Sequence, residues 1–227
     1  MTKIFALIKF GEKEHLESLM HKGQMRFGAL DSFAQSIQKE RGDKFEGAFN
    51  IVNGQFSKIE YNHPVLGKGS FTPVPNTKGT IINFTDDPFF CFSSYALTSD
   101  CFNKTDIHKI DDRMMEFGEY ALVIKEPNIF LGRVKSSLTE LNYPFEGKLT
   151  SYLNFKQEGT VDATLFTKTQ DLQHQFEHRI LIKTERKQEE IFIEIGSIKN
   201  ICFLSRTHEM LQTEFKGKRK SITTTNN

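Results

Sequence analysis

The stretch that decides the expected fold lies at residues 175–182 and reads Gln-Phe-Glu-His-Arg-Ile-Leu-Ile. Successive side chains of a β-strand point to opposite faces. As a strand, this stretch places Gln175, Glu177 and Arg179 on one face, and His178 with apolar neighbours on the other. The pattern therefore predicts a late strand that presents an amide, a carboxylate and a guanidinium from one face, and so a carboxylate held in a fixed position.

A plainer interpretation of the same stretch is an ion pair on the protein surface. Glu177 and Arg179 could lie on a half-exposed strand, where such a pair contributes little to stability. Periodicity alone favours this interpretation. The functional interpretation depends on the other motifs of the chain.

Composition indicates one large domain with a core rich in phenylalanine. The chain has 227 residues, including 22 Phe and no Trp, and a formal net charge of +1. This length supports an independent hydrophobic core, and the balanced charge gives no global attraction to nucleic acid or to an anionic membrane. We expect a single domain over residues 1–215, followed by a frayed basic and polar tail over 216–227.

The cysteines and the N-terminal residues bear on location and on metal binding. Cys91, Cys101 and Cys202 show no paired spacing, which is typical of a reducing compartment and gives no sign of a metal site. The apolar run at residues 4–8 is too short for a signal sequence or a membrane span. We therefore expect a cytoplasmic protein with no membrane partner and no bound metal.

Local patterns predict an α+β fold with a mixed or antiparallel sheet, many strands and few helices. The helix expected at 12–22 has the clearest signals, since Lys22 lies in its last turn and Gly23 follows as a stop. Strands are expected at 4–10, 25–27, 89–97, 120–125, 129–134, 149–155, 175–182, 190–195 and 198–204. Further helices are expected at 31–37, at 106–117, and after a capping residue at Ser205 or Thr207.

Several short motifs occur in a fixed order along the chain. They are Lys9-Phe10-Gly11, His15-Leu16, Arg26-Phe27, Cys91-Phe92-Ser93 and a Gln-x-Glu-x-Arg motif from Gln175 to Arg179. In this order they resemble the ADP-ribosyltransferase superfamily, and more specifically a poorly characterised bacterial group within it. The resemblance covers roughly residues 1–205 and is thin between 48 and 85. It implies a split sheet with a cleft between two small sheets, in which nicotinamide adenine dinucleotide (NAD) is bound and cleaved.

The resemblance also implies a role for each matching residue. Glu177 would be the catalytic glutamate, and Gln175 would position the acceptor. The residues that would bind NAD are Lys9, Phe10, Arg26, Ser93, Ser94, Tyr95 and Arg179. Lys9 departs from the family pattern, which has His or Arg there, and a lysine cannot bind a phosphate or an amide bidentately. Arg26 or Arg179 could supply that contact instead.

The implied reaction breaks the bond between nicotinamide and ribose. This builds positive charge on the sugar, which a carboxylate can stabilise. The resemblance therefore implies an NAD-dependent glycosyltransferase that moves ADP-ribose to a bacterial protein or nucleic acid, as a toxin or phage-defence effector with an antitoxin or regulatory partner. Two alternatives stay open: an NAD glycohydrolase, and a non-enzymatic module on the same fold that binds a nucleotide or a protein.

Other residues have plainer interpretations beside the functional one. Asp43 and Glu46 fall in a charged stretch at 40–47, where a solvated turn is favoured over the rim of a cleft. Ser93 and Ser94 could satisfy backbone groups at a strand end, and Tyr95 could belong to the core. Lys9 could likewise be an exposed lysine at the end of a strand.

Overall fold

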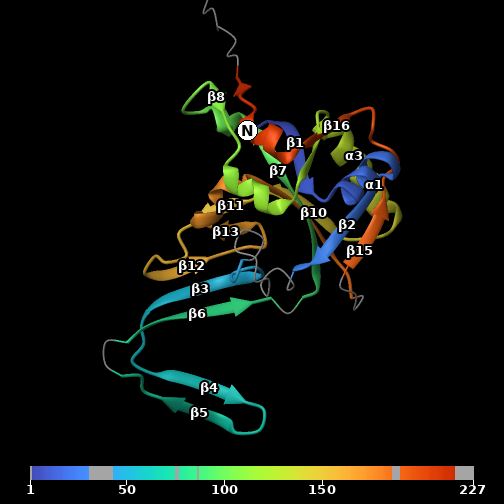
Figure 1. Ribbon diagram of the computed structural model, residues 1–227. Coiled ribbons are helices and arrows are strands. Elements are labelled where there is room, and N and C mark those ends of the chain that lie inside the picture. Colours follow the sequence, from blue (N-terminus) through green and yellow to red (C-terminus); the bar gives the residue numbers. More distant parts are fainter. Residues whose placement is uncertain (1, 31–42, 75–76, 86, 186–189, 218–227) are drawn as a thin grey trace, which may run out of the picture.

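The computed structural model describes residues 2–30, 43–74, 77–85, 87–185 and 190–217 (Figure 1). The described chain is α+β and rich in strands, as the sequence predicts. Its largest sheet is antiparallel throughout. The helix predicted at 31–37 lies outside the described residues.

The largest sheet has eight strands, with β7 (Phe89–Thr98) at its centre. Its main path is β10 (Phe145–Leu149), β14 (Glu177–Lys183), β7, β1 (Ile4–Gly11), β9 (Tyr120–Ile124) and β16 (Cys202–Arg206), while β2 (Gln24–Ala29) joins β7 to β15 (Glu190–Glu194). β7 is almost entirely buried, because strands lie along both of its edges and its two faces meet separate cores.

Two strands share one edge of β7, and they part in its middle. β1 pairs with the C-terminal part of β7, where Ile8 lies opposite Tyr95. β2 pairs with the N-terminal part, where Gly28 lies opposite Cys91. These registers leave residues 92–94 of β7 between the two strands. The sheet is therefore open at this point, next to the end of β1.

Side chains alternate along β7 and so separate two hydrophobic cores. Phe92 and Ala96 face a core that α1 (Lys13–Lys22) and α3 (Pro127–Glu140) cover with their apolar stripes. Tyr95 and Leu97 face a second core. This core also receives buried methionines of η2 (Asp112–Phe117) and α4 (Thr207–Gln212).

Smaller sheets surround the large one. They are β12–β3–β6 (Gly159–Asp162, Ala48–Gln55 and Lys78–Phe84), the parallel pair β11–β13 (Ser151–Leu153 and Thr167–Thr169), β8–β17 (Ile107–His108 and Phe215–Lys216), and the hairpin β4–β5 (Ile59–His63 and Gly67–Phe71). Two further 3-10 helices are η1 (Ser99–Phe102) and η3 (Gln170–Gln175). Figure 1 shows the β4–β5 hairpin projecting away from the large sheet.

Most predicted strands around the site are confirmed, and so is the first helix. α1 ends at Gly23, whose backbone is left-handed, with its N–H bonded to Leu19 O and Ser18 O. The strand predicted at 129–134 is wrong, because this run lies inside α3. There the buried residues Phe130, Val134 and Leu138 recur every four positions, which is the helical spacing, and Pro127 occupies the first turn.

Three other predictions need correction. Residues 106–117 form the short strand β8 and the 3-10 helix η2 instead of an α-helix. β16 begins at Cys202, not at 198. Within the predicted strand at 149–155, Leu149 ends β10 and residues 151–153 form the short strand β11.

The C-terminal helix α4 is not capped as predicted. Its N-cap is Arg206, because the Thr207 hydroxyl donates to Gly118 O at 2.6 Å instead. Glu209 Oε2 accepts from Arg206 N at 3.1 Å. Lys216, expected in the frayed tail, pairs with β8 as part of β17, and residues 218–227 lie outside the described chain. Among the described helices, none is long and apolar enough to cross a membrane.

Gly23 provides a test of the close contact between α1 and the loop after β15. Its φ is 72°, and a Cβ added there would lie 2.1 Å from Gly196 O. We expect Gly23→Ala to lower the free energy of unfolding by about 1–3 kcal/mol, measured by urea denaturation, because it adds strain and overlap. In the matched control Gly132→Ala, the new Cβ meets nothing within 4 Å, and helix propensity predicts a gain of up to about 1 kcal/mol. Equal unfolding midpoints would contradict this reading.

Candidate functional site

A cleft of about 820 Å³ opens where β1 and β2 part along β7. This volume lies in the range of small-molecule sites. All nine residues that the sequence singled out for the site are among those that line it: Lys9, Phe10, Arg26, Ser93, Ser94, Tyr95, Gln175, Glu177 and Arg179. The fold therefore brings together residues from four separate strands and from the end of η3.

The stretch at 175–182 is only partly the strand that its pattern predicts. β14 begins at Glu177, and Gln175 ends the preceding 3-10 helix η3. Phe176 joins the two with a φ of 39°, an uncommon left-handed conformation for a residue other than glycine. The side chain of Gln175 thus reaches the cleft from a turn, and not from the strand face that carries Glu177 and Arg179.

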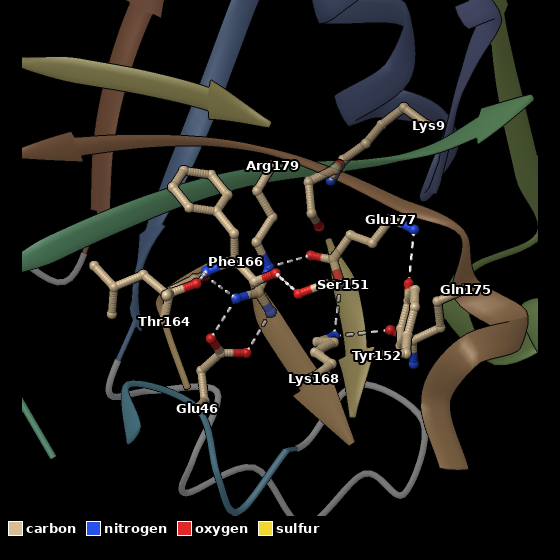
Figure 2. Close-up of polar contacts among 12 residues, drawn as sticks. Lys9, Glu46, Ser151, Tyr152, Thr164, Phe166, Lys168, Gln175, Glu177 and Arg179 are labelled. Atoms are coloured by element: carbon tan, nitrogen blue, oxygen red, sulfur yellow. Dashed lines mark hydrogen bonds and ion pairs between the residues drawn. The ribbon is translucent and has the colours of Figure 1, made fainter. Parts of the chain in front are cut away.

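The ion pair on β14 is buried, so the surface interpretation is wrong. Arg179 is only 1% exposed, and Glu177 is 7% exposed. Arg179 Nε donates to Glu177 Oε1 at 2.9 Å, while its two terminal nitrogens donate to the two oxygens of Glu46 at 2.7 and 2.6 Å (Figure 2). One terminal nitrogen also donates to Leu165 O at 2.6 Å. The guanidinium is therefore held between two carboxylates.

Glu46 belongs to this site and not to a solvated turn, which corrects the favoured prediction. Glu46 and Asp43 are 5% and 4% exposed. Asp43 Oδ1 accepts from Phe45 N at 3.0 Å and so shapes the turn that leads Glu46 inward. A carboxylate tolerates such burial only when it is paired, and Arg179 supplies the pair.

Two further residues of the site have no signal in the sequence. Lys168 and Tyr152 are register partners in the parallel pair β11–β13. The Tyr152 hydroxyl accepts from Glu177 N at 2.9 Å. Lys168 Nζ lies 2.7 Å from Glu177 Oε2 and donates to Gln175 Oε1 at 2.8 Å. Short strands such as these show no periodicity, so the sequence could not single out either residue.

The charges around Glu177 decide its protonation state. Burial on its own raises the pKa of a carboxyl group, but Arg179 and Lys168 outweigh it and lower the pKa of Glu177 to about 2. Burial lowers the pKa of Arg179, and Glu177 and Glu46 more than restore it, so this pKa lies above its usual range. Glu177 is therefore an anion at neutral pH: it can stabilise positive charge, but it has no proton to donate.

Each oxygen of Glu177 faces a cation. Arg179 Nε lies 2.9 Å from Oε1, and Lys168 Nζ lies 2.7 Å from Oε2. The carboxylate is therefore fixed in position from two sides.

The first and central strands place the remaining candidates around the opening in the sheet. Lys9 is half-buried: its Nζ donates to Ser93 O at 2.6 Å and lies 4.6 Å from the centre of the Phe92 ring. Ser94 is buried, and its Oγ has no hydrogen-bond partner among the described residues. The Lys9 ammonium thus binds the carbonyl group of Ser93, in the part of β7 that lies opposite neither β1 nor β2.

Tyr95 belongs to the core beneath the cleft, and Arg26 to its rim. Tyr95 is 2% exposed, its hydroxyl lies 2.6 Å from His108 Nε2, and its ring packs against Phe10 and Phe176. Tyr95 is therefore a core residue, as its plainer interpretation predicts. The Arg26 guanidinium is half-exposed and pairs with Glu190 across β2 and β15.

No protein-family model, curated protein or solved structure matches this chain. Within the described residues, no group of three or more His, Cys, Asp or Glu side chains could hold a metal ion.

A substitution of Glu46 tests how strongly the stability of the protein depends on the buried charges of the site. Glu46→Gln keeps the shape of the side chain but leaves Arg179 and Lys168 facing Glu177 alone. We expect the free energy of unfolding, from urea denaturation, to fall by about 3–5 kcal/mol, because an uncompensated buried charge is strongly destabilising. Glu158→Gln is the matched control, since its pair with Lys78 lies in solvent, and no measurable change is expected. Equal effects of the two substitutions would show that burial of the Glu46 charge is unimportant.

His178 lies on the opposite face of β14 from Glu177 and Arg179, and its burial makes stability depend on pH. It is buried, its Nδ1 has no hydrogen-bond partner among the described residues, and burial lowers its pKa to about 4 against the opposing effect of Glu177. An unfolded histidine has a pKa of about 6.5. The neutral ring therefore stabilises the fold fully above about pH 6.5, and this contribution is lost as the pH falls through about 4.

We expect His178→Gln to flatten the dependence of unfolding free energy on pH between about 6.5 and 4, by about 3 kcal/mol. The exposed His21→Gln should keep the wild-type slope. Urea denaturation at several pH values measures both slopes. A wild-type slope in His178→Gln would mean that His178 does not control this range.

Proposed function

We propose that this chain is an NAD-dependent ADP-ribosyltransferase-like enzyme that transfers ADP-ribose to a protein or a nucleic acid. Glu177 is the proposed catalytic residue. The proposed setting, taken from the resemblance of the motifs, is the bacterial cytoplasm, where the enzyme acts as a toxin or an antiviral effector and an antitoxin or other regulatory partner restrains it.

The observation that carries the proposal is the state of the Glu177 carboxylate. It is buried in the wall of the cleft, ionised, and held between the Arg179 guanidinium and the Lys168 ammonium. A group with this low pKa is unsuited to general acid catalysis at neutral pH. It is suited to stabilising a cation, or to accepting a hydrogen bond from a sugar hydroxyl.

The form of the cleft supports a dinucleotide substrate and a split-sheet fold. β1 and β2 separate along β7, and the cleft follows that separation. Its lining includes the cationic side chains of Lys9, Arg26 and Lys168 alongside four glutamates, of which Glu190 pairs with Arg26 and Glu177 with Lys168. Positively charged side chains favour the two phosphates of NAD. We propose that Lys9 and Arg26 bind the diphosphate, with Lys9 contributing a point charge.

The proposed reaction is a substitution at C1′ of the nicotinamide ribose. The bond between C1′ and the pyridinium nitrogen breaks, and its electron pair stays with nicotinamide, which leaves as a neutral molecule. Positive charge develops on the ribose and is stabilised by Glu177. An oxygen or nitrogen atom of the acceptor then bonds to C1′ and loses its proton to solvent. Gln175, beside Glu177 at the end of η3, is proposed to position that acceptor.

The test uses Glu177→Gln, which removes the charge and keeps the shape of the side chain. The purified protein is incubated with NAD labelled in its adenylate part and a bacterial lysate, and free nicotinamide and macromolecular label are measured. We expect both to fall by about 10²- to 10³-fold, the usual effect of removing one electrostatic group from such a site. Glu146→Gln on β10 is the control, since Glu146 is exposed and pairs with Lys148 on the surface.

Each product pattern has a definite meaning. Label on protein or nucleic acid, formed by the wild type and by Glu146→Gln but lost in Glu177→Gln, would support the transferase. Nicotinamide released together with free ADP-ribose alone would replace it with an NAD glycohydrolase. Absence of nicotinamide release from the wild type would overturn the enzymatic proposal in favour of a binding module. Glu177→Asp, which keeps the charge on a shorter side chain, guards against a loss of activity caused by misfolding of Glu177→Gln.

A further inference from the structure

We propose that Lys168 is a positioning residue of this site, which holds the Glu177 carboxylate and the Gln175 amide side by side as one unit. The inference rests on the proposed function, because it assigns Glu177 to the ribose and Gln175 to the acceptor. Lys168 is 6% exposed and lies on β13, outside the motifs that the sequence singled out.

The contacts of the ammonium group place it between the two side chains. Lys168 Nζ lies 2.7 Å from Glu177 Oε2 and 2.8 Å from Gln175 Oε1 (Figure 2). A lysine ammonium has three N–H donors and no acceptor. Only the oxygen of the Gln175 amide can therefore face it, and the orientation of the amide follows from chemistry. The Nε2 group, with its two N–H donors, must point away from Lys168.

The junction between η3 and β14 explains why such a contact is needed. Gln175 ends η3 and Glu177 begins β14, so the two lie on different elements. Phe176 joins them in a left-handed conformation, which is strained for a phenylalanine and persists only when the surroundings hold it. Lys168 spans this junction from a third element. Its ammonium therefore fixes the carboxylate relative to the amide across the strained residue.

The charge balance shows that Arg179 cannot replace Lys168. The terminal nitrogens of Arg179 are both bound to Glu46, so the guanidinium offers Glu177 only its Nε. Burial raises the pKa of Glu46, and Arg179 and Lys168 oppose this shift. Loss of Lys168 would remove one of the two cations of the cluster, and Glu177 Oε2 would lose the ammonium that lies 2.7 Å from it.

Lys168→Met tests the inference, because methionine fills a similar volume without the charge. We expect nicotinamide release to fall by about 10- to 100-fold in kcat, the usual effect of losing a group that orients a reacting residue, with a change in KM for NAD of less than about threefold. The fraction of released ADP-ribose that reaches the macromolecular acceptor should fall as well, since Gln175 is no longer held. Lys168→Arg, which keeps a cation, should recover part of both.

The matched control is Lys156→Met. Lys156 is an exposed lysine that pairs with Asp171 in η3 and should leave all these quantities unchanged. If Lys168 acts only by holding the fold together, Lys168→Met will lower kcat in proportion to the folded fraction and leave the ratio of transfer to release unchanged. That result would overturn the proposal.

A second measurement separates this inference from the proposed function. The pKa of the Glu177 carboxyl is followed by carbon-13 NMR in wild type and in Lys168→Met, and the side-chain amide of Gln175 by nitrogen-15 NMR. We expect the pKa to rise by about one unit or more, because a cation at hydrogen-bond distance is lost while Arg179 stays, and we expect the Gln175 amide signals to change. Unchanged pKa and amide signals would refute the role of Lys168, whereas a wild type without nicotinamide release would refute only the proposed reaction.

Discussion

The structure around the cleft depends on the complete burial of one guanidinium group. Arg179 lies on β14 inside the large sheet, where a charge without partners would be strongly destabilising. It is neutralised by Glu177 on its own strand and by Glu46, which precedes β3. The pairing with Glu46 thus joins the large sheet to the chain that enters the smaller β12–β3–β6 sheet. The position of the catalytic candidate and the connection between sheets are consequences of the same ion pairs.

A second constraint arises from the shared edge of β7. Backbone carbonyl groups inside a protein need hydrogen-bond donors. Residues 92–94 of β7 have no register partner in β1 or in β2, because these two strands separate at this point. Lys9 Nζ donates a hydrogen bond to one of these carbonyl groups, Ser93 O, and forms a cation–π contact with the Phe92 ring. This contact suits a compact ammonium on a flexible stem better than a planar guanidinium. It gives a physical reason for the lysine at the position where the resemblance leads one to expect His or Arg.

Local sequence patterns predicted the parts of the fold that are determined locally, and they failed where distant residues decide. The dense apolar run at 89–97 and the stop signal at Gly23 correctly predicted β7 and α1, whereas the apolar run at 129–134 was too short to tell a strand from a helix. Glu46 looked like a surface residue because its partner Arg179 is 133 positions away in sequence. Lys168 was missed for the same reason: the chain gives no sign that a side chain of β13 contacts Glu177 at the start of β14.

The buried cluster of Glu46, Glu177, Arg179 and Lys168 is hard to explain as a stabilising device. Well-packed apolar side chains of similar volume often stabilise a protein as much as a buried ion pair does, or more. A cluster of this kind is better explained by what it prepares, since ionisable groups with strongly shifted pKa values gather at functional sites. Here two cations hold one carboxylate ionised at a cleft wall, so little reorganisation is needed when positive charge develops beside it.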